Sequence, residues 1–131
     1  MDLNQYLQVP YVDGGRDLAG WDCWGKVRWI GHHDFAYPLF ESFGHVHPDD
    51  KQSLHNSFEQ IQYEFDPCQP KAGAIACLFR RGVLVHVGIC VEVGGLLQVI
   101  HTSRQYGAEI IKRRDFERLA LVTKYYAYRD K

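Results

Sequence analysis

The chain has 131 residues, of which 46% are hydrophobic and 24% are charged, and this is enough apolar material for one hydrophobic core. The formal net charge of −1 argues against a nucleic acid as partner. No apolar run reaches the roughly 20 residues that span a bilayer, and residues 1–10 lack the basic end and apolar centre of a signal peptide. We therefore expect a single domain that is synthesised in the cytoplasm and binds neither nucleic acid nor membrane.

The first part of the sequence predicts two short helices separated by a loop. Residues 3–9 are amphipathic, and residues 11–17 have the glycine and aspartate content of a shaped loop. Asp22 is a good helix N-cap, and apolar side chains follow it at helical spacing until Gly31. These signals predict a helix that begins at Cys23 and stops at Gly31.

Residues 32–70 have a weaker pattern, with aromatic side chains spread through an irregular stretch. Pro48-Asp49-Asp50 is a helix-start signal, and Leu54, Phe58 and Ile61 mark one side of the helix that follows. We interpret the segment 32–70 as an insertion that forms a lid or a buttress.

The rest of the sequence is typical of β-structure, because Val, Ile, Leu and Tyr alternate with turn-forming glycines. The expected strands are residues 73–80, 83–93, 96–101, 109–112 and 121–128. The aromatic and cationic residues near the C-terminus fit strand alternation better than a nucleic-acid surface. Helices first and antiparallel strands second predict an α+β domain.

Two histidines are brought together by a predicted hairpin. Gly94-Gly95 has the pattern of a two-residue turn that needs positive φ. With Val93 opposite Leu96, strand alternation places His86 and His101 on the same face as diagonal neighbours, with backbones about 7 to 8 Å apart. The alternative is that both are hydrogen-bonded core residues without a chemical role.

Cys23 has the neighbours that nucleophilic thiol chemistry needs. A helix N-terminus and a nearby imidazolium both favour thiolate over thiol, and the same imidazole can protonate a leaving amine. Asp22 is most simply a helix cap, although its charge would oppose thiolate formation. The spacing of the four cysteines matches no zinc or disulfide pattern, so we expect them reduced, with Cys77 and Cys90 packed as small hydrophobes.

Four motifs resemble the successive signatures of the NlpC-type cysteine peptidases, papain-like enzymes that cut cell-wall peptides. They are Tyr11-Val12-Asp13-Gly14-Gly15, Gly20-Trp21-Asp22-Cys23-Trp24-Gly25, His86-Val87-Gly88-Ile89 and Val99-Ile100-His101-Thr102-Ser103. The match covers most of the chain except residues 32–70. It implies one papain-like α+β domain over residues 1–131, with N-terminal helices packed on an antiparallel sheet.

The resemblance also implies roles for individual residues. Cys23 is the nucleophile, His86 the general base and acid, and His101 the residue that orients His86. Tyr11 lines the site and helps to hold the oxyanion, which the backbone N–H of Cys23 would also meet. The implied reaction is hydrolysis of the amide between D-glutamate and a diamino acid in peptidoglycan stem peptides, without a cofactor or a metal.

Trp24 stands where many relatives have serine, in a form associated with phage tail proteins of the family. A phage tail or prophage enzyme, with tail proteins as partners, is therefore implied. Without a signal peptide it would reach the cell wall through a tail, a secretion machine or lysis. Arg16 is a candidate for the charged end of a stem peptide, and Trp21 and Trp24 are candidates for the cleft walls, although a solvated charge and core packing are the alternatives.

Other functions stay open at this point. The chain could be an inactive tail-assembly or interaction domain, or an amidase or acyltransferase, including a toxin, on the same fold. Cys23, His86 and His101 could instead hold a catalytic zinc. The histidine pairs in His32-His33-Asp34 and His45-Val46-His47 offer a weak structural metal site.

Overall fold

The computed structural model describes residues 1–47 and 49–129. Within them the helices are α1 (Leu3–Gln8), α2 (Cys23–Phe35), α3 (Lys51–Ile61), the 3₁₀ turn η1 (Gln62–Glu64) and α4 (Arg113–Glu117). None of the helices in this described part of the chain has the length and apolar character to cross a membrane.

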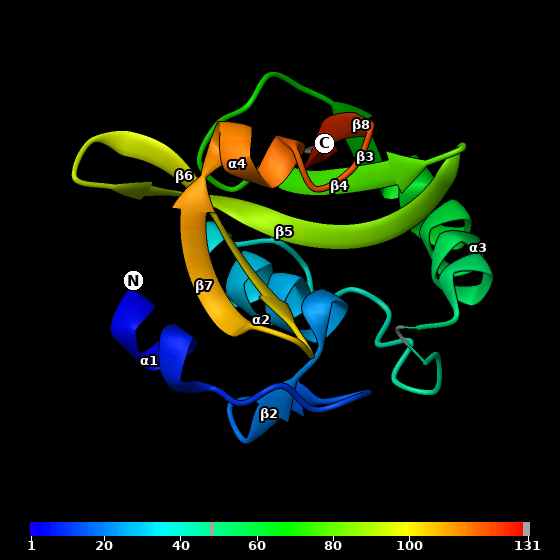
Figure 1. Ribbon diagram of the computed structural model, residues 1–131, viewed down its shortest axis with the longest axis horizontal. Helices are drawn as coiled ribbons and strands as arrows, with labels where there is room; N and C mark the ends of the chain where they lie inside the picture. Colours follow the sequence, from blue (N-terminus) through cyan, green and yellow to red (C-terminus); the bar gives the residue numbers. More distant parts are fainter. Residues whose placement is uncertain (48, 130–131) are drawn as a thin grey trace.

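One antiparallel sheet of six strands forms the centre of the molecule, in the order β3-β8-β4-β5-β6-β7 (Figure 1). Its strands are β3 (Phe65–Pro67), β4 (Ile75–Arg80), β5 (Val83–Val93), β6 (Leu96–Ser103), β7 (Gly107–Lys112) and β8 (Val122–Tyr128). A separate ribbon pairs β1 (Arg16–Asp17) with β2 (Gly20–Trp21) just before α2.

The sheet carries a core on each face. Helices α2 and α3 pack on β5 (Figure 1), and the larger cluster lies on this side, where Val27, Ile30 and Val87 are buried. Helix α4 packs on β6 and β7, and its fully buried Phe116 belongs to a second cluster with Cys90. Alternate side chains of β5 therefore pack into the clusters on opposite faces of the sheet, which explains why β5 is buried along almost its whole length.

Helix α2 begins where predicted, because Asp22 caps it by accepting a hydrogen bond from the backbone N–H of Gly25 at 2.9 Å. The prediction that it ends at Gly31 is wrong: the helix continues to Phe35 and ends at Ala36, whose φ is 58°. Gly31 is needed for packing, since a Cβ there would lie 2.9 Å from the Tyr37 ring. The glycine in the middle of α2 therefore allows the close approach of Tyr37 and does not end the helix.

Helix α3 confirms the prediction made from its apolar face. Asp50 is the N-cap and accepts from the Ser53 N–H at 3.1 Å, while Leu54 and Ile61 are buried. Pro48, the first residue of the predicted start signal, lies outside the described residues. The reading of 32–70 as an insertion stays a prediction.

The hairpin of β5 and β6 has the predicted register. Gly94 and Gly95 have φ of 59° and 80°, and the ladder runs from Val93↔Leu96 to Ile89↔Ile100. The two strands stay close beyond the ladder, because a Cβ added to Gly88 would lie 3.2 Å from the Cβ of His101. All five predicted strands are present with small shifts at their ends, whereas β3 and α4 were not predicted.

Candidate active site

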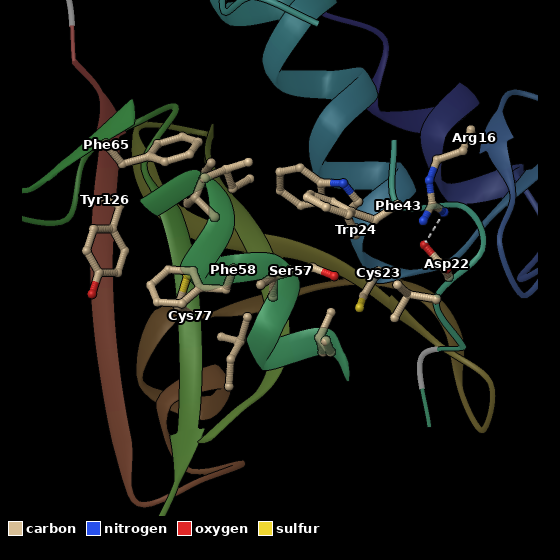
Figure 2. A pocket seen from close by; sticks show the side chains of 16 residues that line it. Arg16, Asp22, Cys23, Trp24, Phe43, Ser57, Phe58, Phe65, Cys77 and Tyr126 are labelled. Carbon is tan, nitrogen blue, oxygen red and sulfur yellow. Dashed lines mark hydrogen bonds and ion pairs between the residues drawn. The ribbon is translucent and has the colours of Figure 1, made fainter. Parts of the chain in front are cut away.

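Cys23 is the first residue of α2, and its side chain is 5% exposed. Figure 2 shows its sulfur facing a cavity near Ser57 of α3. The backbone N–H groups of Val87 and Trp24 lie close enough to the sulfur to act on its pKa. Strand β5 therefore meets the start of α2 at the residue that follows His86.

The thiol of Cys23 is neutral at neutral pH. Burial and, to a smaller extent, the adjacent Asp22 carboxylate raise its pKa from 9.0 to about 11. The Lys51 ammonium and the two backbone N–H groups act in the opposite direction without reversing the shift. Burial therefore outweighs the helix terminus, which by itself favours the thiolate.

His86 and His101 are in direct contact, as the hairpin register predicts. Nε2 of His86 lies 2.9 Å from Nδ1 of His101, and the rings meet edge to face. Both rings also pack against Phe116, with centroid distances of 5.8 Å and 5.3 Å. Burial and, to a smaller extent, the neighbouring His101 lower the pKa of His86 to about 3, so His86 is a neutral imidazole at neutral pH.

The sulfur and the imidazoles are close in the fold but not hydrogen-bonded. Val87 lines the cavity that Cys23 faces, whereas His86 alternates with it and packs on Phe116. Over residues 1–47 and 49–129, no hydrogen bond joins the Cys23 sulfur to either ring. The structure thus brings the thiol to the backbone N–H of Val87, next to His86, whereas both imidazole rings pack against Phe116 of the second cluster.

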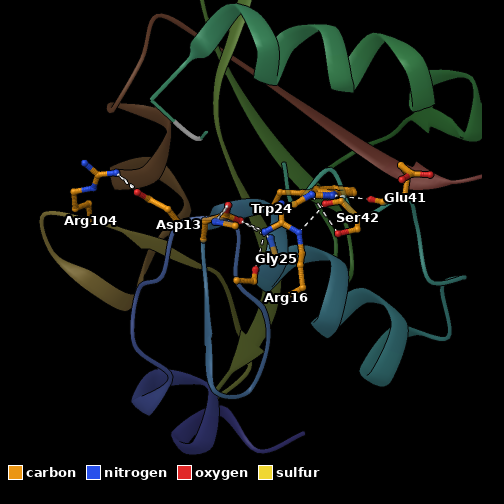
Figure 3. A network of polar contacts seen from close by, with 11 residues as sticks. Asp13, Arg16, Trp24, Gly25, Glu41, Ser42 and Arg104 are labelled. Carbon is orange, nitrogen blue, oxygen red and sulfur yellow. Dashed lines mark hydrogen bonds and ion pairs between the residues drawn. The ribbon is translucent and has the colours of Figure 1, made fainter. Parts of the chain in front are cut away.

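Arg16 joins three segments around the helix cap. Figure 2 shows its guanidinium beside Asp22, and Figure 3 shows it beside Ser42. Nη1 donates to Oδ1 of Asp22 at 2.7 Å and to the Gly15 carbonyl at 2.6 Å, and Nε donates to the Ser42 carbonyl at 2.7 Å. Because these donors are already satisfied internally, Arg16 fixes the loop before α2, and its predicted contact with a substrate carboxylate stays a prediction.

Tyr11 is half-buried and pairs in parallel with Trp21. Burial and a hydrogen bond to the Asp13 carboxylate raise the pKa of its hydroxyl, and proximity to Cys23 contributes. Asp13 in turn accepts from Nη2 of Arg104 at 2.8 Å and 2.6 Å (Figure 3). Tyr11 is therefore a protonated donor held near the thiol.

The two tryptophans that flank Cys23 have different surroundings. Trp21 has no exposed surface and packs between Tyr6 and Trp29. This corrects its candidacy as a cleft wall, because a ring without exposed surface presents nothing to a substrate. Trp24 lines the cavity beside Cys23, and its Nε1 donates to the Glu41 carbonyl at 3.0 Å.

The cavity at Cys23 is small and apolar, with a volume of about 50 Å³. Its two charged lining residues, Arg16 and Asp22, are paired with each other. A polar groove of about 470 Å³ lies between the segment 41–50 and α3. The two hollows share Phe43, Val46 and Ser57, which separate the sulfur from the groove.

Comparison with known proteins identifies the architecture. No protein-family model matches the chain, and no curated protein matches its sequence. Among solved structures it is similar to the crystal structure of the NlpC/p60 domain of peptidoglycan hydrolase SagA, with a TM-score of 0.58 and 21% identity over 96% of this chain and 92% of that chain. The chain has the NlpC/p60 fold. The predicted papain-like α+β architecture, with helices packed on an antiparallel sheet, is confirmed.

Two polar residues of this NlpC/p60 fold were missed by sequence reasoning. Glu109 of β7 is the cross-strand partner of His101, and its Oε1 lies 3.1 Å from Nε2 of that ring. Lys26 is fully buried, and its Nζ donates to the His101 carbonyl at 3.2 Å. A lysine within the apolar stripe of α2 was a signal that could have been noticed, whereas Glu109 required the register of β6 with β7.

In this NlpC/p60 fold, two of the candidate metal ligands, His32 and His33, make other contacts. Nδ1 of His32 contacts the Tyr37 carbonyl at 2.7 Å, and the His33 ring stacks on Trp29. In the part of the chain that the structure describes, no three His, Cys, Asp or Glu side chains are grouped to hold a metal. Cys77 and Cys90 are buried free thiols, as predicted.

Proposed function

We propose that this chain is a cysteine peptidase that hydrolyses peptidoglycan stem peptides between D-glutamate and a diamino acid. The supporting observation is the hydrogen-bonded His86–His101 pair on a hairpin whose strand β5 meets the Cys23 sulfur at Val87. The NlpC/p60 fold supports the same conclusion, because the similar solved domain is that of a peptidoglycan hydrolase.

The first chemical step starts from a neutral thiol and a neutral imidazole. As the sulfur attacks the substrate carbonyl carbon, His86 accepts the thiol proton, so neither a free thiolate nor an imidazolium needs to persist beforehand. The pKa values of about 11 for Cys23 and about 3 for His86 oppose proton transfer in the resting protein, so the transfer must be coupled to bond formation with the substrate. Substrate binding must close the gap between the sulfur and the ring, as catalytic contacts often tighten only in the complex.

The oxyanion of the tetrahedral intermediate would lie at the start of α2. The first amide groups of a helix have no partner within the helix, so the Cys23 N–H is available to donate to it. The Tyr11 hydroxyl, which lies near the thiol, becomes a second donor once its single proton turns from the Asp13 carboxylate to the oxyanion. Expulsion of the amine then breaks the C–N bond and leaves an acyl group on sulfur, with the His86 imidazolium supplying the proton to the amine.

Water resolves the acyl-thioenzyme in the second half of the reaction. His86, neutral again, accepts a proton from the attacking water and returns it to the sulfur as the C–S bond breaks. His101 holds the His86 ring throughout through the 2.9 Å contact. No metal or cofactor is required in this scheme.

The route to the cell wall is part of the proposal. Trp24 after the nucleophile supports a phage tail or prophage enzyme that is made in the cytoplasm and delivered by a tail assembly. Co-purification of the chain with tail proteins of the corresponding phage tests this point. A chain found free in the medium without lysis or a phage particle would contradict it.

A second candidate is an amidase or acyltransferase, and the cavity at Cys23 favours it. Leu54, Phe58 and Ile61 line a space without an unpaired charge, which suits an apolar acyl group better than a charged one. The buried thiol also fits an inactive structural domain. The reaction products distinguish both alternatives from the peptidase.

The test is digestion of purified peptidoglycan, with mass spectrometry of the released muropeptides. The wild-type chain should cut the D-glutamyl bond, and Cys23→Ala should lose at least about 10³-fold in rate. Cys68→Ala is the matched control, because Cys68 is a half-buried free thiol away from the cavity. Release of a different fragment would favour the amidase, and full activity in Cys23→Ala would refute the thiol mechanism.

A further inference from the structure

Three titratable side chains form a row across neighbouring strands. His86 lies on β5, His101 on β6 and Glu109 on β7, and the ladder places Glu109 directly opposite His101. The ring nitrogens are 2.9 Å apart, and the carboxylate is 3.1 Å from the remaining nitrogen of His101. His101 is 3% exposed, whereas Glu109 is 40% exposed, so the row runs from the site toward the surface.

The hydrogen bond between the two rings has two possible directions. A neutral imidazole carries one N–H, and the position of that proton decides which nitrogen accepts. If His101 carries its proton on Nε2, its Nδ1 accepts from Nε2–H of His86, and Nδ1 of His86 keeps its lone pair. If His101 is protonated on Nδ1 instead, it donates to His86, whose proton must then sit on Nδ1.

Glu109 distinguishes these two states. Its negative oxygen faces Nε2 of His101, where a proton is attracted and a lone pair is repelled. The contact lies off the line of the Nε2–H bond, so it acts through charge more than as an aligned hydrogen bond. We propose that Glu109 is a positioning residue that holds the proton on Nε2 of His101 and thereby leaves Nδ1 of His86 as the base for the Cys23 thiol.

Burial keeps His101 neutral, and Lys26 acts in the same direction. The Nζ of Lys26 donates to the His101 carbonyl at 3.2 Å and lies 5.8 Å from the Trp21 ring centroid. Burial lowers the pKa of Lys26 to about 7, so Lys26 is only partly charged at neutral pH. Its charged form opposes the protonation of the imidazole that the Glu109 carboxylate would otherwise favour. Burial of His101, opposed by Glu109 and assisted by Lys26, lowers its pKa. Burial therefore keeps the ring neutral, and the Glu109 charge favours one tautomer of it.

The inference rests on the proposed function, but the tautomer can be read without any substrate. Ring ¹⁵N NMR of the whole chain, with His86→Gln and His101→Gln spectra to assign the signals, reports which nitrogen carries each proton. In the wild type, both rings should be protonated on Nε2. In Glu109→Ala, the second state, with Nδ1–H on both rings, should become measurably populated, whereas the control Glu92→Gln should change nothing. Glu92 is a matched control because it is an exposed glutamate of the same sheet.

Activity provides the second readout. Glu109→Ala should lower kcat by about tenfold or more with KM nearly unchanged, and Glu109→Asp should restore part of the loss. Should Glu109→Ala fail to fold, Glu109→Gln keeps the shape and removes the charge. Unchanged tautomers in a folded, charge-free variant would overturn the inference, even if activity fell. Changed tautomers with no detectable activity in the wild type would instead count against the proposed function alone.

Discussion

Replacement of Asp22 by Asn should make the Cys23 thiol more reactive while it weakens the fold. Asp22 is the second cause, after burial, of the rise in the Cys23 pKa from 9.0 to about 11. Asparagine keeps the helix-capping oxygen but carries no charge. At pH 8 the thiolate fraction changes tenfold for each unit of pKa, so removal of this part of the shift should speed alkylation by about three- to tenfold.

The same substitution should lower stability. The Asp22 carboxylate accepts from Nη1 of Arg16 at 2.7 Å and from the Gly14 and Gly25 N–H groups at 3.0 Å and 2.9 Å. Loss of its charge leaves the guanidinium of Arg16 without an anion, which costs about 1.5 to 3 kcal/mol for a hydrogen bond to a charged group. Urea unfolding at pH 7 measures this loss.

The assay is iodoacetamide labelling at pH 8, with tryptic mass spectrometry to count modification at each cysteine. Cys77 lines the same cavity and is an internal control for opening of the fold. Faster labelling of Cys23 with Cys77 unchanged supports the electrostatic reasoning. An unchanged or slower rate at Cys23 would refute it, and equal acceleration at both cysteines would show that the fold had opened instead.

Three further predictions concern the titration of His86 and the close contacts of two glycines, Gly88 and Gly31. His86 has its pKa lowered from 6.5 to about 3, so its contribution to stability is present above pH 6.5 and is lost as pH falls toward 3. It should give a slope of about 1.4 kcal/mol per pH unit that His86→Gln removes in urea titrations. Gly88→Ala places a Cβ 2.7 Å from a Val99 methyl carbon and 3.2 Å from the His101 Cβ. The new methyl group should displace the His101 ring and reduce kcat. A wild-type kcat would contradict the packing argument. In Gly31→Ala the added Cβ meets the Tyr37 ring at 2.9 Å, so the free energy of unfolding should fall by about 1 to 3 kcal/mol, as measured by thermal unfolding. Helix propensity alone predicts a gain in stability, and such a gain would show that the Tyr37 ring moves aside freely.

Local patterns predicted the parts of the site that depend on short-range rules. The two glycines of the β5–β6 turn set the register, and the register predicted the His86–His101 contact. The capping residue Asp22 likewise set the first residue of α2. In both cases one residue type determines the geometry of its immediate neighbours, so no knowledge of the tertiary fold was needed.

The remaining features depend on contacts between distant segments. Glu109 faces His101 only because β7 pairs with β6 in one particular register. Burial of the Cys23 thiol depends on α3, which brings Leu54 and Ser57 to the cavity, and this burial reverses the pKa shift expected from the helix start alone. The catalytic roles of Cys23, His86 and His101 stay predictions.

The central claim is that Cys23 forms a covalent acyl intermediate. Rapid-quench mass spectrometry of the intact chain, mixed with a defined muropeptide, tests it directly. We expect an added mass equal to the acyl fragment, located on Cys23, which accumulates before free product and is absent in Cys23→Ala. Cleavage of the muropeptide by Cys23→Ala at the wild-type rate would contradict it.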